Sequence, residues 1–145
     1  MLATEYLETL AFVCQMQREE RDFKLATCMP SMHALWARDV ALLAETRELL
    51  FTDPVVGLLS GVGMDEYRFS HLTLQEYLAA RCALRLYGHH VEELVRHLTP
   101  LHSRWKREVL QFTACMLTDN FVAFCQTILQ CDNEAGANCE LVRAF

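Results

Sequence analysis

The chain has 145 residues, a formal net charge of −6 at pH 7 and a hydrophobic fraction of 52%. This length and composition suit one globular domain or two small ones with a substantial core. The acidic balance disfavours nucleic-acid binding, because phosphate recognition requires a basic surface. No apolar run approaches the ~20 residues of a membrane-spanning helix, so neither nucleic acid nor a membrane is an expected partner.

Seven cysteines are spread along the sequence without any C-x-x-C pair. Structural zinc sites require closely spaced ligands, and disulfide frameworks contain paired cysteines, so we expect neither a metal site nor a disulfide framework. Reduced thiols in a cytoplasmic protein are the expected state. The N-terminal stretch MLATEYLETL also lacks the basic flank of a secretory signal.

The predicted elements begin with a helix. Thr4 is a suitable cap for a helix that continues to about Arg18, where the charged run REERD ends it. A loop that contains Pro30 follows. A second helix is expected from Ser31, because leucines recur there at sevenfold spacing, and the Asp-Pro pair at residues 53–54 would end it.

A β-hairpin is predicted next. The segments VVGLLS and EYRFSHL flank a turn at residues 61–65, and the glycines there supply the positive backbone angles that tight turns require. In the second strand, Tyr67, Phe69 and His71 project to one side because side chains alternate along a strand. His71 would be the last residue of that strand.

The pattern then changes to that of a helix, predicted from Leu74 to Tyr87. Thr73 is expected to be its N-cap, and Glu76 completes a T-x-x-E capping box in which each side chain bonds a backbone amide at the other residue. Leu72 and Tyr77 would form a hydrophobic staple. The helix is apolar on most sides, as expected for a helix buried between neighbours.

The remainder of the chain, after a C-cap at Gly88, has a helical pattern. A short helix is expected over Val91–Leu98, a second carries Trp105, and a third starts near Phe121. Short helices with a large aromatic anchor favour a solenoid-like arrangement. The predicted fold class is therefore mainly α: a winged-helix unit with a small β-hairpin over residues 1–88, then the start of a truncated α-helical domain over residues 89–145.

No enzymatic site is predicted. A phosphate-binding loop requires G-x-x-x-x-G-K-[ST], and the glycines between Gly57 and Gly63 are not followed by a lysine. The nucleophile elbow G-x-S-x-G is also missing from the sequence. We therefore expect a chain that is not an enzyme. On pattern alone, His71 is interpreted as a strand-end histidine hydrogen-bonded to a neighbouring backbone group.

The segment YRFSHLTLQEYLAA favours a functional interpretation of His71 instead. It resembles the [Y/F]-x-F-x-H-x-[T/S]-[F/L]-Q-E-[Y/F]-x-A-A motif that follows the nucleotide-binding core in NACHT-type STAND NTPases, the group that includes NOD-like receptors. A weaker similarity covers residues 4–130, where LETLAFVCQMQ resembles the first helix of the family's winged-helix domain and RWKREVLQFTACML a helix of the domain that follows. The residues that match the motif are Phe69, His71, Thr73, Gln75, Glu76, Tyr77, Ala79 and Ala80.

The resemblance implies a role in regulation. In such proteins the winged-helix domain folds back on the nucleotide-binding core in the resting state, and the motif's histidine, His71 here, contacts the β-phosphate of ADP. The Walker motifs are absent from this chain. The implied function is that of an autoinhibitory, nucleotide-state-sensing segment of a signalling NTPase, most often in innate immunity. The segment itself takes no cofactor; ADP or ATP belongs to the full-length parent, whose core is the partner in cis and which forms homo-oligomers when activated.

Two alternatives stay open. A free-standing helical protein–protein interaction module would bind a partner through exposed apolar faces. A DNA-binding winged helix would need a basic recognition helix, whereas the helix that follows Thr73 is largely apolar. An in-frame phosphate-binding loop encoded immediately upstream would distinguish the regulatory segment from the free-standing module.

Overall fold

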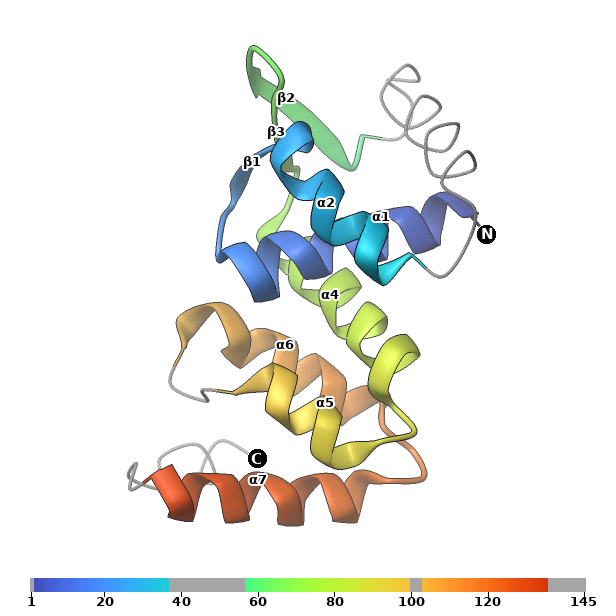
Figure 1. Cartoon of the computed structure of the whole chain (residues 1–145), viewed down its shortest axis with the longest axis vertical. Helices are drawn as coiled ribbons and strands as arrows, with labels where there is room; N and C mark the ends of the chain where they lie inside the picture. Colours follow the sequence, from blue (N-terminus) through green and yellow to red (C-terminus); the bar gives the residue numbers. More distant parts are fainter. Residues whose placement is uncertain (1, 37–56, 100–102, 136–145) are drawn as a thin grey trace.

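The computed structural model describes residues 2–36, 57–99 and 103–135. Helices predominate in this part of the chain and accompany one small antiparallel sheet (Figure 1). The predicted class, mainly α with a small β-hairpin, is confirmed. Among the helices that the structure describes, none combines the length and the apolar character needed to cross a membrane.

The first helix changes its pitch before it ends. α1 spans Leu2–Phe12, and a π-helical segment, η1, continues it over Val13–Arg18. The end at Arg18 agrees with the prediction, but the helix begins before Thr4, which is exposed. Glu19 closes η1 in a left-handed conformation with φ of 56°, an arrangement that lets amides beyond the helix bond its last carbonyls.

Two elements between residues 22 and 36 differ from the prediction. Asp22–Lys24 forms a strand, β1, that the sequence pattern does not reveal. α2 spans Leu25–Leu35, so Pro30 lies inside a helix rather than in a loop. Proline cannot donate the hydrogen bond to the carbonyl four residues earlier, but three buried side chains share one face of α2 and favour the helix: Leu25, Cys28 and Met32. The rest of the predicted second helix, after Trp36, lies outside the described residues.

The predicted hairpin is confirmed. β2 (Leu59–Gly63) pairs with β3 (Glu66–Phe69), and β3 also pairs with β1, so the strand order is β1-β3-β2 with antiparallel neighbours. The positive φ in the turn belongs to Asp65, at 55°, rather than to a glycine. Arg68 donates two hydrogen bonds to the carboxylate of Asp22, its direct neighbour across the β1–β3 pair. The assignment of these elements to a winged-helix unit stays a prediction.

In the described part of the chain, four helices follow the sheet, and they lie mostly in the lower half of Figure 1. They are α4 (Leu72–Tyr87), α5 (Val91–Leu98), α6 (Arg104–Met116) and α7 (Phe121–Ala135). The bounds of α5 and the C-cap at Gly88 are as predicted. A Cβ atom at position 88 would collide with the Leu84 carbonyl oxygen, which explains why glycine ends α4.

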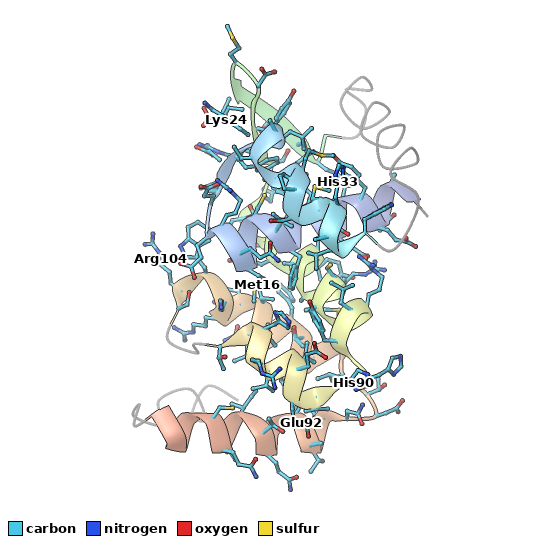
Figure 2. The ribbon with its side chains drawn as sticks, in the orientation of Figure 1. Met16, Lys24, His33, His90, Glu92 and Arg104 are labelled. Carbon is cyan, nitrogen blue, oxygen red and sulfur yellow. The ribbon has the colours of Figure 1, made fainter. Side chains whose placement is uncertain are left out.

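One cluster of buried side chains connects these elements. It includes Phe23 and Phe69 of the sheet, Leu10 of α1, Leu94 of α5 and Phe124 of α7. Met16 of η1, labelled in Figure 2, belongs to the same cluster. The domain boundary near residue 88 stays a prediction, because buried side chains from both sides of it share this core.

A buried carboxylate joins α1 to α4. Glu8 is 3% exposed and forms ion pairs with Arg81 at 3.0 Å and with Arg85 at 3.3 Å. The two arginines are four residues apart, so they lie on one face of α4 and both reach the same carboxylate. Arg85 also donates a hydrogen bond to the hydroxyl of Thr9 at 3.0 Å. Glu8 therefore has two cationic partners at a position that excludes most water.

Replacing Glu8 should therefore destabilise the fold. We expect Glu8→Gln to lower the free energy of unfolding by about 1–3 kcal/mol, because two guanidinium groups lose a shared anion while their own partial exposure limits the loss. Urea unfolding followed by circular dichroism measures the change. Glu92→Gln is the control, since Glu92 is exposed at the start of α5, and it should cost less than about 0.5 kcal/mol. Equally small losses in both variants would contradict the expectation.

Candidate functional site at the β3–α4 junction

The motif begins on a firmly held strand end. Phe69, the last residue of β3, is fully buried, and its ring packs against Phe23 of β1 with centroids 5.8 Å apart. Ser70 then makes two hydrogen bonds to the segment before β2. Its amide donates to the carbonyl of Leu58 at 2.9 Å, and its hydroxyl donates to the carbonyl of Gly57 at 2.5 Å. The backbone just before the motif histidine is therefore fixed.

His71 is the N-cap residue of α4, and its side chain is exposed. Its backbone is extended, with φ −129° and ψ 132°, and its carbonyl accepts a helical hydrogen bond from the Gln75 amide at 3.2 Å. Among the residues that the structure describes, none bonds the imidazole. The interpretation of His71 as a histidine satisfied by neighbouring backbone is therefore wrong for the described part of the chain.

The predicted capping box is also wrong. α4 begins at Leu72, so Thr73 already lies in the first turn, where it is exposed, and Leu72 cannot occupy the staple position before the cap. No side-chain cap bonds the helix start within the described residues. Glu76, the other half of the predicted box, is only 6% exposed. Burial of Glu76 in the folded chain outweighs its local capping preference.

Gln75 belongs to a buried hydrogen-bond network. Its Nε2 donates to Oε1 of Gln15 at 2.9 Å and to the carbonyl of Glu20 at 3.1 Å. Gln15 in turn donates through its own Nε2 to the carbonyl of Trp105 in α6. Both glutamine side chains are fully buried. The network therefore connects η1, the chain that follows it, α4 and α6.

Glu76 and Tyr77 both face α6. Burial raises the pKa of Glu76, and the negative charge of Glu108 raises it further. Tyr77 is partly exposed and meets the ring of Phe112 edge-on, with centroids 5.8 Å apart and planes at 82°. These contacts, together with the Gln75 network, hold the first turns of α4 against α6.

The motif residues thus separate into two groups. Phe69, Gln75 and Glu76 are buried and position the junction, whereas His71 and Thr73 are exposed at the start of α4. The first amides of a helix lack helical partners and lie at the positive end of its dipole, so this end of a helix favours anions. An imidazole beside such amides can donate a hydrogen bond to an anionic oxygen.

Sequence reasoning missed the partner of Gln75. The available signal was Gln15, a polar residue inside the apolar run LAFVCQM, because a polar side chain in a buried helix usually has a specific partner. In residues 2–36, 57–99 and 103–135, no three His, Cys, Asp or Glu side chains are grouped to hold a metal ion. The described cysteines are free thiols.

Removing the Gln75 amide should be costly. We expect Gln75→Ala to lower the free energy of unfolding by about 2–4 kcal/mol, because Gln15 Oε1 loses a buried donor and a cavity forms. Thr73→Ala is the matched control on the same turn and should cost less than about 0.5 kcal/mol, since Thr73 does not cap α4. Chemical denaturation of both variants measures the two losses. A larger loss for Thr73→Ala than for Gln75→Ala would contradict this assignment.

Glu76 should make stability depend on pH. Its pKa is higher in the folded state, so the folded state binds this proton more tightly than the unfolded state does. The contribution of Glu76 to the free energy of unfolding is therefore most favourable below its pKa in the unfolded chain, about 4.3. This contribution is lost as the pH rises through the pKa of Glu76 in the folded chain. Glu76→Gln should therefore gain stability relative to the unchanged chain between pH 4 and pH 7 when unfolding is measured across that interval. A constant difference over the same interval would rule out this titration.

Comparisons of the chain with protein-family models, with curated proteins and with solved structures give no significant match. The relationship to NACHT-type NTPases is therefore supported by the motif in residues 67–80 and stays a proposal.

Proposed function

We propose that this chain is the regulatory segment of a cytoplasmic, NACHT-type signalling NTPase. In this role, the winged-helix unit and the helices after it hold a nucleotide-binding core in its inactive state while ADP is bound. The observation that carries the proposal is the position of His71: an exposed imidazole at the N-terminus of a 16-residue helix, without a partner among the described residues.

The rigid surroundings of His71 support such a contact. Phe69 is buried on one side of it, Ser70 is bonded through both its amide and its hydroxyl, and Gln75 is bonded within the core on the other side. A donor whose backbone is already ordered loses little conformational freedom when it binds. An imidazole in this position is therefore suited to a phosphate group presented by another domain.

The contact between His71 and the phosphate would act as a switch because it forms only in the closed, ADP-bound state. A hydrogen bond to a charged acceptor contributes roughly 1.5–3 kcal/mol, which corresponds to a factor of about 10–150 in an equilibrium constant. Because the contact exists only in the closed state, its loss shifts the population toward the open state by that factor. The core would supply the phosphate-binding loop and hydrolyse the nucleotide, and the open state would assemble into homo-oligomers.

The test is His71→Ala in a chain that carries the nucleotide-binding core in cis. ADP should dissociate more readily, with an affinity lower by about 10–150-fold, because the β-phosphate loses a donor. The melting temperature should hardly change, since the side chain of His71 is exposed. Nucleotide retention is measured on the purified protein, and oligomeric state by analytical ultracentrifugation.

His90→Ala is a matched control, because His90 is also an exposed N-cap histidine, at the start of α5 (Figure 2). It should leave ADP retention and oligomeric state unchanged. If His71→Ala retains ADP as well as His90→Ala and the unsubstituted chain do, the nucleotide-sensing role of His71 is excluded.

A free-standing interaction module is the second candidate, and α7 is the observation that favours it. Phe121, Val122 and Leu129 are 41%, 68% and 37% exposed on this helix. Exposed apolar side chains on a single helix suit contact with another helix. The His71 variant separates the two candidates, because an interaction module does not require a nucleotide contact.

A further inference from the structure

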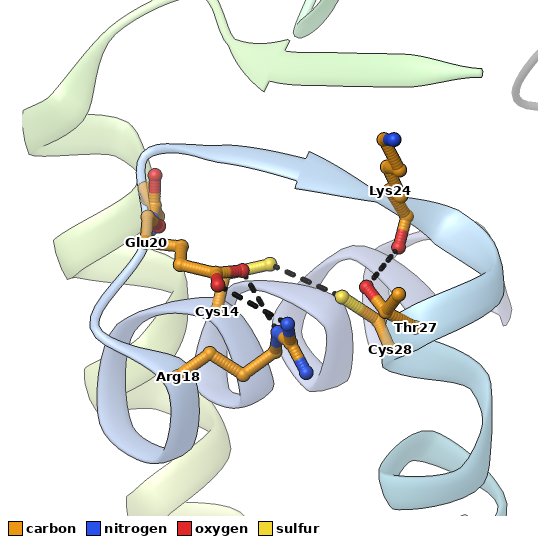
Figure 3. Close-up of polar contacts among 7 residues, drawn as sticks. Cys14, Arg18, Glu20, Lys24, Thr27 and Cys28 are labelled. Atoms are coloured by element: carbon orange, nitrogen blue, oxygen red, sulfur yellow. Dashed lines mark hydrogen bonds and ion pairs between the residues drawn. The ribbon is translucent and has the colours of Figure 1, made fainter.

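Two buried thiols face each other between η1 and α2. The sulfur atoms of Cys14 and Cys28 are 3.9 Å apart, and both residues are fully buried. Figure 3 shows the two sulfur atoms directed toward each other, one from each helix. Cys82 is buried as well, but its sulfur accepts a hydrogen bond from Arg85 instead of meeting a second thiol. The Cys14–Cys28 pair therefore has a geometry that Cys82 lacks.

The surroundings make the two thiols unequal. The hydrogen bond from Cys14 lowers the pKa of Cys28, and the positive charge of Arg18 lowers it further. Burial and the hydrogen bond to Cys28 raise the pKa of Cys14. Cys28 is therefore the thiol that loses its proton first, while Cys14 stays protonated beside it. A thiolate next to a second thiol is the arrangement in which disulfides form readily.

The pair lies one layer below the surface. Arg18 is partly exposed and forms an ion pair with Glu20 at 2.8 Å, and Thr27, next to Cys28, is exposed (Figure 3). A small oxidant needs only a local opening between η1 and α2 to reach the sulfur atoms. Side-chain rotation would then bring them from 3.9 Å to the ~2.05 Å of a disulfide bond.

We propose that Cys14 and Cys28 are a reversible redox pair, which a peroxide converts into an intramolecular disulfide between η1 and α2. The Cys28 thiolate attacks hydrogen peroxide, the O–O bond breaks, hydroxide leaves, and Cys28 becomes a sulfenic acid. The sulfur of Cys14 then attacks the sulfur of Cys28, the S–O bond breaks, and the departing hydroxide takes the Cys14 proton. Two thiols lose two electrons and two protons in total, and peroxide is reduced to two molecules of water.

The disulfide would act on the junction between α4 and α6. Cys14 precedes Gln15, whose side chain bonds Gln75 of α4 and the Trp105 carbonyl of α6. Tying Cys14 to α2 would restrain the η1 backbone that carries Gln15. The proposal is independent of any nucleotide contact, so its failure would leave the proposed regulatory function untouched.

The test uses the full chain under native conditions. After treatment with hydrogen peroxide and alkylation of the remaining thiols, peptide mapping by mass spectrometry should find Cys14 linked to Cys28 with the loss of two hydrogen atoms. Dithiothreitol should reverse the link. The oxidised chain should also melt on the order of 5–10 °C higher, because the cross-link restrains the unfolded chain.

Two serine variants distinguish this pair from other thiols. Cys28→Ser should abolish the dithiothreitol-reversible rise in melting temperature, whereas Cys82→Ser should retain it. The proposal is overturned if Cys14 and Cys28 stay as thiols while the exposed Cys115 is oxidised, or if the reversible rise survives in Cys28→Ser. Mapping of the unsubstituted chain decides the question even where a variant fails to fold.

Discussion

The side-chain amide of Gln75 is the group on which the arrangement of the helices depends. A buried amide without partners is costly, of order 1–3 kcal/mol for each unmet group. The Nε2 atom of Gln75 meets this demand with partners 60 and 55 residues away in sequence, and one of them, Gln15, bonds a carbonyl 90 residues farther along the chain. The Oε1 atom of Gln75 is buried without a hydrogen-bond partner among the described residues. A packing that moved η1 or α6 would leave buried polar groups unpaired. The network therefore selects one arrangement in a way that apolar contacts alone do not.

This constraint also determines how α4 presents the motif histidine. On one side, Glu8 of α1 holds Arg81 and Arg85 in the later turns of α4. On the other side, Gln75 and Tyr77 hold its first turns against η1 and α6. The start of α4 is consequently rigid although it is open to solvent. The proposed contact of His71 with a phosphate group requires this combination of rigidity and exposure.

Local patterns predicted the elements that local interactions determine. The hairpin and the whole of α5 follow from periodicity, and the end of α4 follows from the position of Gly88. β1 escaped prediction because Asp22 and its neighbours are a strand only by pairing with β3, with Asp22 opposite Arg68. The site was predicted in part. Strand alternation assigns Phe69 and His71 to the same side of one strand. In the structure β3 ends at Phe69, which is buried, whereas His71 lies beyond the strand and is exposed. The capping box failed because burial of Glu76 is a tertiary effect that no local pattern contains.

The π-helical segment Val13–Arg18 has a consequence for chain length. Its wider turn lets adjacent residues serve different neighbours, since Cys14 meets α2 while Gln15 meets α4 and α6. A π-helical turn contains about one residue more than an α-helical turn, so loss of one residue here would return the helix to ordinary pitch without rotating α1. Glu8 and the apolar face of α1 would still face α4, but Cys14 and Gln15 could no longer both keep their present partners. The extra residue in this segment therefore serves the contacts of η1 rather than the direction of α1.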